Sequence, residues 1–273
     1  MTVSAQGGPG DTFNIFAALA AWLNPQDAVV PADELYPPGQ SQQQTQQQDN
    51  QEMTGSQQTA TSAALEELHI PYQVVVAQAE QGYPAYHVLR AGDVISTVDG
   101  QPVTGQTSLS NLINAHPAGT TLTLTILRKG KAERLKVATK EVDGTRLIGV
   151  VISFKFPFSV NISVGDIGGP SAGLMFALGI IDKLTPLDLT GGKFIAGTGE
   201  ITAGGQVQPI GGIQQKMVGA RDAGATIFLT PAANCPDTKG AVPAGLRLVK
   251  VSTLAQAVTY LEAINAGQAV PSC

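Results

Sequence analysis

The chain has 273 residues, of which 43% are hydrophobic, so it has enough apolar side chains to fill two modest cores. Its 31 glycines and 17 prolines favour many turns and argue against a long helical bundle. A net charge of -5 without any local cluster of Lys and Arg argues against a nucleic-acid partner. The best candidate for a membrane span, 13–23, contains Asn14 and is too short.

The N-terminal part of the chain predicts two helices separated by a polar segment. Residues 11–23 carry apolar side chains at helical spacing behind two candidate caps, Asp11 and Thr12, and we expect this helix to pack in a core. Seven of the nine residues in 40–48 are Gln, which favours a mobile polar loop. Apolar residues at helical spacing then predict a second helix over 51–68.

The next segment, 72–140, predicts a compact module rich in β-structure. Residues 120–127 alternate between polar and apolar side chains, as in a strand with one buried face. Tight turns are indicated by Asp99-Gly100 and Lys129-Gly130. The expected strands are 73–77, 93–98, 120–127 and 134–137, with a short helix at 108–115.

Two stretches of this module, Leu89-Arg90-Ala91-Gly92-Asp93-Val94-Ile95 and Val98-Asp99-Gly100-Gln101-Pro102-Val103, resemble PDZ domains of the type associated with bacterial proteases. The resemblance implies that a peptide C-terminus is bound as an added strand beside the second strand and below the helix. The groove would then be lined by Val74, Val76, Leu109, Leu112 and Ile113. The alternative for each of these residues is that it only fills the core of the module.

From about residue 147 the chain changes to apolar strands separated by glycine turns. Strands are expected at 148–154, 159–164, 194–201, 226–229 and 246–251. Helices are expected at 174–181, around Lys216, and at 253–263. This alternation of helices and strands predicts an α/β (α+β) fold class.

Gly169-Pro170-Ser171-Ala172-Gly173 has the G-x-S-x-G pattern of a nucleophilic serine. An α/β-hydrolase would need a histidine downstream, but the three histidines (His69, His87 and His116) all lie upstream. A lysine can replace histidine as the base if burial keeps it neutral. Lys216 has this setting, because it lies among apolar residues with no acidic residue before Asp222, whereas Lys183 and Lys193 lie in polar turns.

This serine pattern is followed by Thr198-Gly199-Glu200-Ile201, Pro209-Ile210-Gly211-Gly212-Ile213 and Lys216, in an order and spacing that resemble the proteolytic domain of the Lon family over 149–263. The resemblance implies the Lon-type (ribosomal protein S5 domain 2-like) fold and a catalytic dyad of Ser171 and Lys216. Thr198 would hydrogen-bond the lysine. The turn at Gly169 and Pro170 would place the serine at a helix N-terminus, where backbone N–H groups can bind an oxyanion.

Together with Leu35-Tyr36-Pro37-Pro38-Gly39, the two modules resemble the actinobacterial PDZ-containing Lon-like proteins. This implies a PDZ domain at 66–140 inserted between an N-terminal part, 1–65, and a catalytic domain, 141–273. It also implies an extracytoplasmic location with an N-terminal membrane anchor outside the given sequence. The chain has no G-x-x-x-x-G-K-[ST] motif, so we expect no nucleotide and an activity independent of ATP.

Cys235 and Cys273 lie in loop-like sequence without metal-ligand spacing, so no metal or other cofactor is expected. We expect a disulfide that holds the C-terminus; the alternative is two free thiols.

The expected function is an ATP-independent serine endopeptidase that acts on protein or peptide substrates recruited by the PDZ domain. The sequence leaves open whether the chain forms a homo-oligomer. The main alternative is a PDZ-bearing adaptor with an inactive protease domain, against which the intact Ser171, Thr198 and Lys216 argue. A non-proteolytic acyl hydrolase is a weaker alternative.

Overall fold

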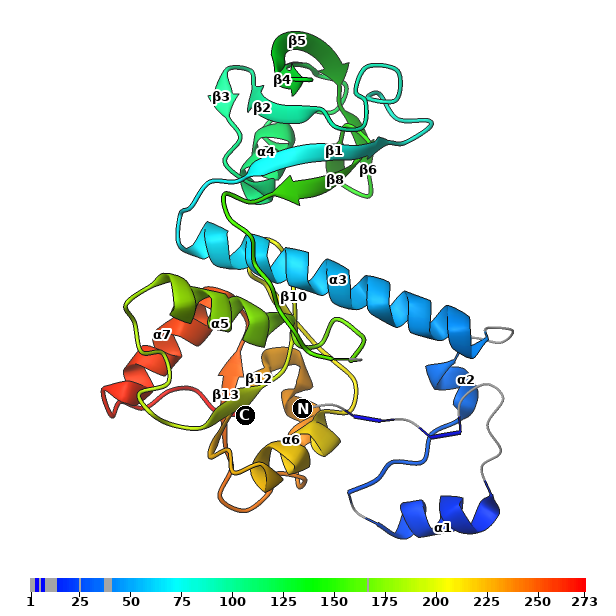
Figure 1. Ribbon diagram of the computed structural model, residues 1–273, viewed down its shortest axis with the longest axis vertical. Helices are drawn as coiled ribbons and strands as arrows, with labels where there is room; N and C mark the ends of the chain where they lie inside the picture. The colour runs from blue at the N-terminus through cyan, green and yellow to red at the C-terminus, as the bar shows by residue number, and fades with distance from the viewer. Residues whose placement is uncertain (1–2, 5, 8–13, 25, 37–40, 166) are drawn as a thin grey trace. The chain divides into compact units, whose positions relative to one another are not determined.

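The computed structural model describes the chain except for residues 1–2, 5, 8–13, 25, 37–40 and 166 (Figure 1). It divides into two compact units: a discontinuous unit, Met1–Thr61 with Ile162–Cys273, and an inserted unit, Ser62–Asn161. The mixed α/β architecture confirms the expected fold class. In the part of the chain that the structure describes, no helix combines the length and apolarity needed to span a membrane.

The inserted unit is built on an antiparallel sheet with the strand order β5-β4-β2-β1-β8, and β3 pairs with β2 (Figure 1). The side chains buried at its centre include Val74, Ile95, Leu122, Leu124 and Ile126. Its elements are β1 (Gln73–Ala79), β2 (Val94–Val98), β3 (Gln101–Pro102), α4 (Gln106–Asn114), β4 (Thr121–Arg128), β5 (Lys131–Ala138), β6 (Lys140–Val142), β7 (Thr145–Leu147) and β8 (Val150–Lys155).

Strand β8 belongs to this sheet, although the sequence analysis placed it within 141–273. It pairs with β1 from Gln73↔Lys155 to Ala79↔Val150. Strand β1 is also paired with β2 on its other edge, so β8 forms one end of the sheet. The chain therefore leaves the inserted unit only after β8, at Asn161.

The discontinuous unit contains a parallel sheet in the order β13-β12-β9 and a separate hairpin of β10 and β11. Strand β12 is buried along its whole length, and α7 packs against β13 and beside α5 (Figure 1). Its elements after the insertion are α5 (Gly173–Leu184), β9 (Ile195–Gly197), β10 (Glu200–Ile201), β11 (Val207–Gln208), α6 (Ile213–Asp222), β12 (Ile227–Pro231), the 3₁₀ helix η1 (Ala232–Thr238), β13 (Arg247–Val251) and α7 (Leu254–Asn265). The strand expected at 159–164 does not form; this segment is irregular.

The first helix, α1 (Ile15–Leu23), does not pack in a core, and that expectation was wrong. It is capped by Asn14, whose side chain accepts a hydrogen bond from the Ala17 N–H, while the expected caps Asp11 and Thr12 lie outside the described residues. Phe16 is 79% exposed and none of the helix residues is buried. A short helix, α2 (Ala32–Leu35), follows.

The expected polar loop at 40–48 is instead the start of a long helix, α3 (Gln42–Glu67). Ser41 begins it with a capping box, because the Gln44 N–H donates to Ser41 Oγ while the Gln44 side chain accepts from the Ser41 N–H. Gln also has a high helix propensity, so a Gln-rich tract behind a cap favours a helix. The expected helix at 51–68 is confirmed as the continuation of α3, with Met53 among its buried residues.

Candidate active site

The predicted nucleophile lies in a turn that leads directly into α5. Gly169 has a φ of +84°, a conformation that favours glycine, and Ala172 is the N-cap residue of α5. The carbonyl of Ser171 accepts two hydrogen bonds of 2.8 Å, one from the Gly199 N–H and one from Thr198 Oγ1. The backbone of Ser171 is therefore held by the segment that joins β9 to β10.

Lys216 approaches the serine from the first turn of α6. The helix begins after Gly212, whose left-handed φ of +67° suits glycine, and Ile213 and Met217 are buried beside the lysine. The side chain of Lys216 is only 7% exposed. Its Nζ lies 2.6 Å from Ser171 Oγ and 3.2 Å from Thr198 Oγ1. The structure thus brings the three predicted side chains together within hydrogen-bond distance.

Burial lowers the pKa of Lys216 below the ordinary value of a lysine, because the charged form loses its hydration in this surrounding. None of the ion pairs among the described residues involves Lys216. Within the described part of the chain, no ion pair therefore offsets the cost of the charge, and the neutral amine is favoured. A neutral amine at this distance can accept the proton of the serine hydroxyl.

The backbone next to the serine has free donors. The N–H groups of Ser171 and Ala172 have no acceptor among the described residues, and Pro170 has no N–H to offer. They lie at the N-terminus of α5, where the helix dipole favours negative charge. This arrangement can stabilise an oxyanion that forms on a carbonyl attacked by Ser171.

Helix α3 supports the turn in front of the serine, a feature that the sequence analysis missed. Ser56 is buried and its Oγ donates a 3.0 Å hydrogen bond to the Pro170 carbonyl, while the Gly169 N–H donates to the Asp49 carbonyl at 3.2 Å. The available signal was spacing: Ser56 is three residues after Met53, a buried residue of α3, and therefore lies on the same face of the helix.

The residues expected to line a peptide groove lie mostly inside the inserted unit. Val74, Val76, Leu109 and Ile113 are buried in its core, and Leu112 is partly buried against it. Strand β1, which carries Val74 and Val76, is hydrogen-bonded on both edges and cannot accept a peptide strand. Among the described strands, the two open edges of this sheet belong to β5 and β8, and β8 is the one that lies next to β1.

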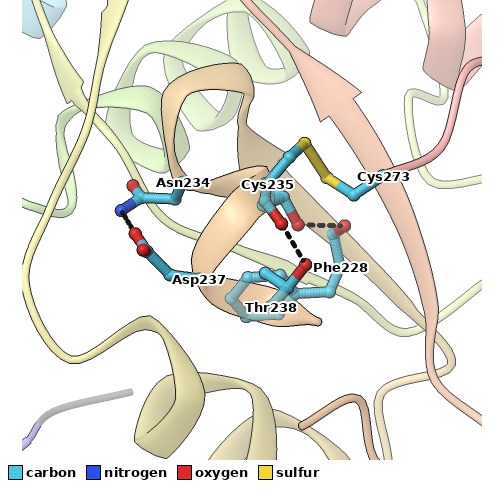
Figure 2. The surroundings of a disulfide bond; sticks show 7 residues. Phe228, Asn234, Cys235, Asp237, Thr238 and Cys273 are labelled. Atoms are coloured by element: carbon cyan, nitrogen blue, oxygen red, sulfur yellow. Dashed lines mark hydrogen bonds between the residues drawn. A yellow bond between two sulfur atoms is a disulfide. The ribbon is translucent and has the colours of Figure 1, made fainter. Parts of the chain in front are cut away.

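The predicted disulfide between Cys235 and Cys273 is confirmed (Figure 2). It joins η1 to the C-terminal tail across a sequence separation of 38 residues, with the two Cα atoms 5.2 Å apart. Among the described residues there is no group of three or more side chains that could hold a metal ion.

Comparisons with known proteins match both halves of the chain. Residues 43–139 match the PDZ domain family, and residues 160–262 match the Lon protease (S16) C-terminal proteolytic domain. A Lon protease of Roseiflexus castenholzii is 46% identical over 71 residues, which are 26% of this chain and 9% of that protein. Lon protease 1 of Bacillus subtilis is 31% identical over 123 residues, 42% of this chain and 16% of that protein.

The chain thus spans less than a fifth of the length of these two Lon proteases. Among solved structures, the PDZ domain of the SdrC-like protein of Listeria innocua is 26% identical, covering 29% of this chain and 92% of that one, with a TM-score of 0.28. The two family matches show that the chain combines a PDZ domain with a Lon-type C-terminal proteolytic domain, the domain composition of a PDZ-containing Lon-like protease.

Proposed function

We propose that the chain is a serine endopeptidase that hydrolyses peptide bonds with a dyad of Ser171 and Lys216. The observation that carries this proposal is the 2.6 Å separation between Lys216 Nζ and Ser171 Oγ, with the lysine buried and outside any of the described ion pairs. A serine hydroxyl is a weak nucleophile near neutral pH, and a general base at this distance activates it.

Thr198 orients the base. Its hydroxyl carries one hydrogen, which is donated to the Ser171 carbonyl, so toward Lys216 it can only accept. One N–H of the neutral amine therefore points at Thr198, and the nitrogen lone pair is left for the Ser171 hydroxyl. Thr198 acts as a positioning residue in this proposal.

The reaction follows from these positions. Lys216 Nζ takes the proton of Ser171 Oγ as the oxygen attacks the substrate carbonyl, and the oxyanion accepts hydrogen bonds from the Ser171 and Ala172 N–H groups. The resulting ammonium of Lys216 then donates its proton to the leaving amine, and an acyl-enzyme remains. A water molecule, deprotonated by Lys216, hydrolyses the acyl-enzyme and restores both side chains.

We further propose that the activity does not require ATP, since the sequence contains no P-loop motif. The PDZ domain would recruit substrates through the open edge of β8, where a peptide can add as a further strand. Partly buried side chains of β8, such as Ile152 and Phe154, pack against the core and offer an apolar surface next to this edge. The disulfide supports a location in an oxidising, extracytoplasmic compartment.

The dyad is tested with a fluorogenic, unstructured peptide and purified variants. Ser171→Ala and Lys216→Arg should lower kcat by roughly 10²- to 10⁴-fold, because the first removes the nucleophile and the second keeps a permanent charge where a base is needed. Thr198→Val should have a smaller effect. Circular dichroism and thermal unfolding establish that each variant is folded.

Near-normal turnover by Lys216→Arg would show that Lys216 is not the base. A wild-type protein that binds peptides at β8 but cleaves none under any pH would instead identify the chain as a peptide-binding adaptor. Binding at β8 is measured from backbone amide chemical shifts, which should change along β8 and not along the interior strand β1.

A further inference from the structure

Asn234 is a buried polar residue that the dyad does not explain. It lies on η1, is 4% exposed, and uses both ends of its side-chain amide on a single residue of another segment. Asn234 Oδ1 accepts from the Ile210 N–H at 2.9 Å, and Asn234 Nδ2 donates to the Ile210 carbonyl at 3.0 Å. The side chain thus pairs with Ile210 as a neighbouring β-strand would.

Ile210 lies just before α6, the helix that carries Lys216. It is followed by Gly211 and Gly212, and α6 begins at the next residue. A Cβ at Gly211 would meet no atom within 4 Å, whereas one at Gly212 would meet Val3 Cγ2 at 3.2 Å, so Gly211 is the part of the two-glycine link with little packing of its own. Lys216 is in the first turn, where its N–H donates to the Gly212 carbonyl. The position of Lys216 therefore depends on how firmly Ile210 is held.

Helix η1 also forms a hydrogen bond with the first turn of α6. Gln214, in the first turn of α6, donates a 2.8 Å hydrogen bond to the Asp237 carbonyl. The side chain of Asp237 accepts from Asn234 Nδ2 at 3.2 Å (Figure 2). The contacts of Asn234 and Gln214 therefore belong to one network. The disulfide at Cys235 fastens η1 to the C-terminal tail. Helix η1 thus contacts the chain three residues before the first residue of α6, at Ile210, and one residue after it, at Gln214.

We propose that Asn234 is a positioning residue of the active site, which holds the start of α6 so that Lys216 Nζ stays buried against Ser171 Oγ. The inference rests on the proposed function. If the contact with Ile210 is lost, two backbone groups lose their partners and the two-glycine link can shift. Water then reaches Nζ, and the amine becomes easier to protonate. The polar groups that face Nζ are the uncharged hydroxyls of Ser171 and Thr198, and the nearest carboxylate in the network is Asp237.

The test compares Asn234→Ala with Asn265→Ala. Asn265 is the control because its amide also bonds two backbone groups, the carbonyls of Asp188 and Leu189, on a loop remote from α6 in sequence; unlike Asn234, it is exposed. For each variant, kcat and KM are measured across pH together with thermal unfolding. Asn234→Ala should lower kcat at neutral pH by roughly 10- to 100-fold with little change in KM.

The pH profile separates positioning from stability. In Asn234→Ala the rise in activity should occur at a higher pH than in the wild type, with partial recovery in alkaline buffer, whereas Asn265→Ala should keep the wild-type profile. Asn234→Asp should give an intermediate shift, since a carboxylate can still accept from the Ile210 N–H but cannot donate to its carbonyl.

A second readout does not need activity: the titration of Lys216 followed by NMR of its side-chain carbon next to Nζ. The titration midpoint in Asn234→Ala should move up, toward that of an ordinary lysine. If both the pH profile and the titration are unchanged, the proposal is overturned and Asn234 only stabilises the fold. If the titration moves but the wild type hydrolyses no peptide, the proposed function fails while the positioning role stands.

Discussion

Removing the disulfide should destabilise the discontinuous unit by an amount that the structure allows to be calculated. The double variant Cys235→Ser/Cys273→Ser opens a loop whose ends are 38 residues apart and which contains β13 and α7. In the chain-entropy model, the cross-link acts by removing conformations from the unfolded chain. The folded state keeps its other contacts with the tail, including the hydrogen bond from the Lys250 N–H to the Pro271 carbonyl.

The length of the loop determines how much the free energy of unfolding falls when the disulfide is removed. A separation of 38 residues corresponds to an entropy loss of about 13 cal/mol/K in the unfolded chain, or about 4 kcal/mol near room temperature. We therefore expect the free energy of unfolding to fall by about 4 kcal/mol in the double variant. For a domain of this size, Tm should fall by roughly 8–16 °C.

The assay is urea unfolding followed by circular dichroism on the oxidised wild type, the reduced wild type and the double variant. The reduced wild type and the double variant should unfold together, because both lack the cross-link, and reductant should not affect the double variant. A loss of less than about 1 kcal/mol would refute the calculation and show that the unfolded chain is already restrained in this region.

Three further predictions concern buried polar groups. Because burial depresses the pKa of Lys216, the unfolded chain binds more protons than the folded one between that pKa and about 10.4. The free energy of unfolding of the wild type should therefore rise with pH in this interval. Urea unfolding of Lys216→Met should not show this rise. For Asp93, burial raises the pKa but hydrogen bonds from Arg128 outweigh it and the pKa is lowered, so its stabilisation is present above about pH 4 and is lost as pH falls through the folded pKa. Asp93→Asn should cost the PDZ domain roughly 3 kcal/mol in urea unfolding at neutral pH, and a loss that persists in strong acid would contradict the assignment. Ser56→Ala should lower the free energy of unfolding by only about 1 kcal/mol but kcat by roughly tenfold, because it frees the carbonyl in front of the nucleophile. The control Thr61→Val removes a hydrogen bond within α3 itself and should keep kcat. An equal loss of kcat in the two variants would argue against a role of Ser56 in the turn.

Much of the candidate site was accessible from residue types and order. Ser171 lies in a small-residue turn before an apolar helix, and Lys216 lies among apolar neighbours, so each carried a local signal of its chemistry. The strands of the PDZ domain were predicted for a related reason, since alternating side chains mark a face that must be buried. The disulfide followed from two cysteines without metal spacing.

Local patterns failed where the partner was distant. An apolar helix such as α1 shows which side chains would gain from burial but not whether another segment covers them. The Gln-rich composition of the start of α3 favours a loop, but the capping box at Ser41 makes this segment a helix. A serine or asparagine such as Ser56 or Asn234 has no periodic signature when its partner is a backbone group far along the chain.

The sequence was therefore sufficient for the two domain types, the fold class, the disulfide and the choice of the candidate site residues Ser171, Thr198 and Lys216, because each depends on residue identity and short-range spacing. The sequence did not predict that β8 is an edge strand, that α1 is exposed, or that Asn234 forms hydrogen bonds with Ile210 before the start of α6. Those features depend on which segments meet in space, and sheet order and buried hydrogen bonds between distant segments are set only when the whole chain has packed.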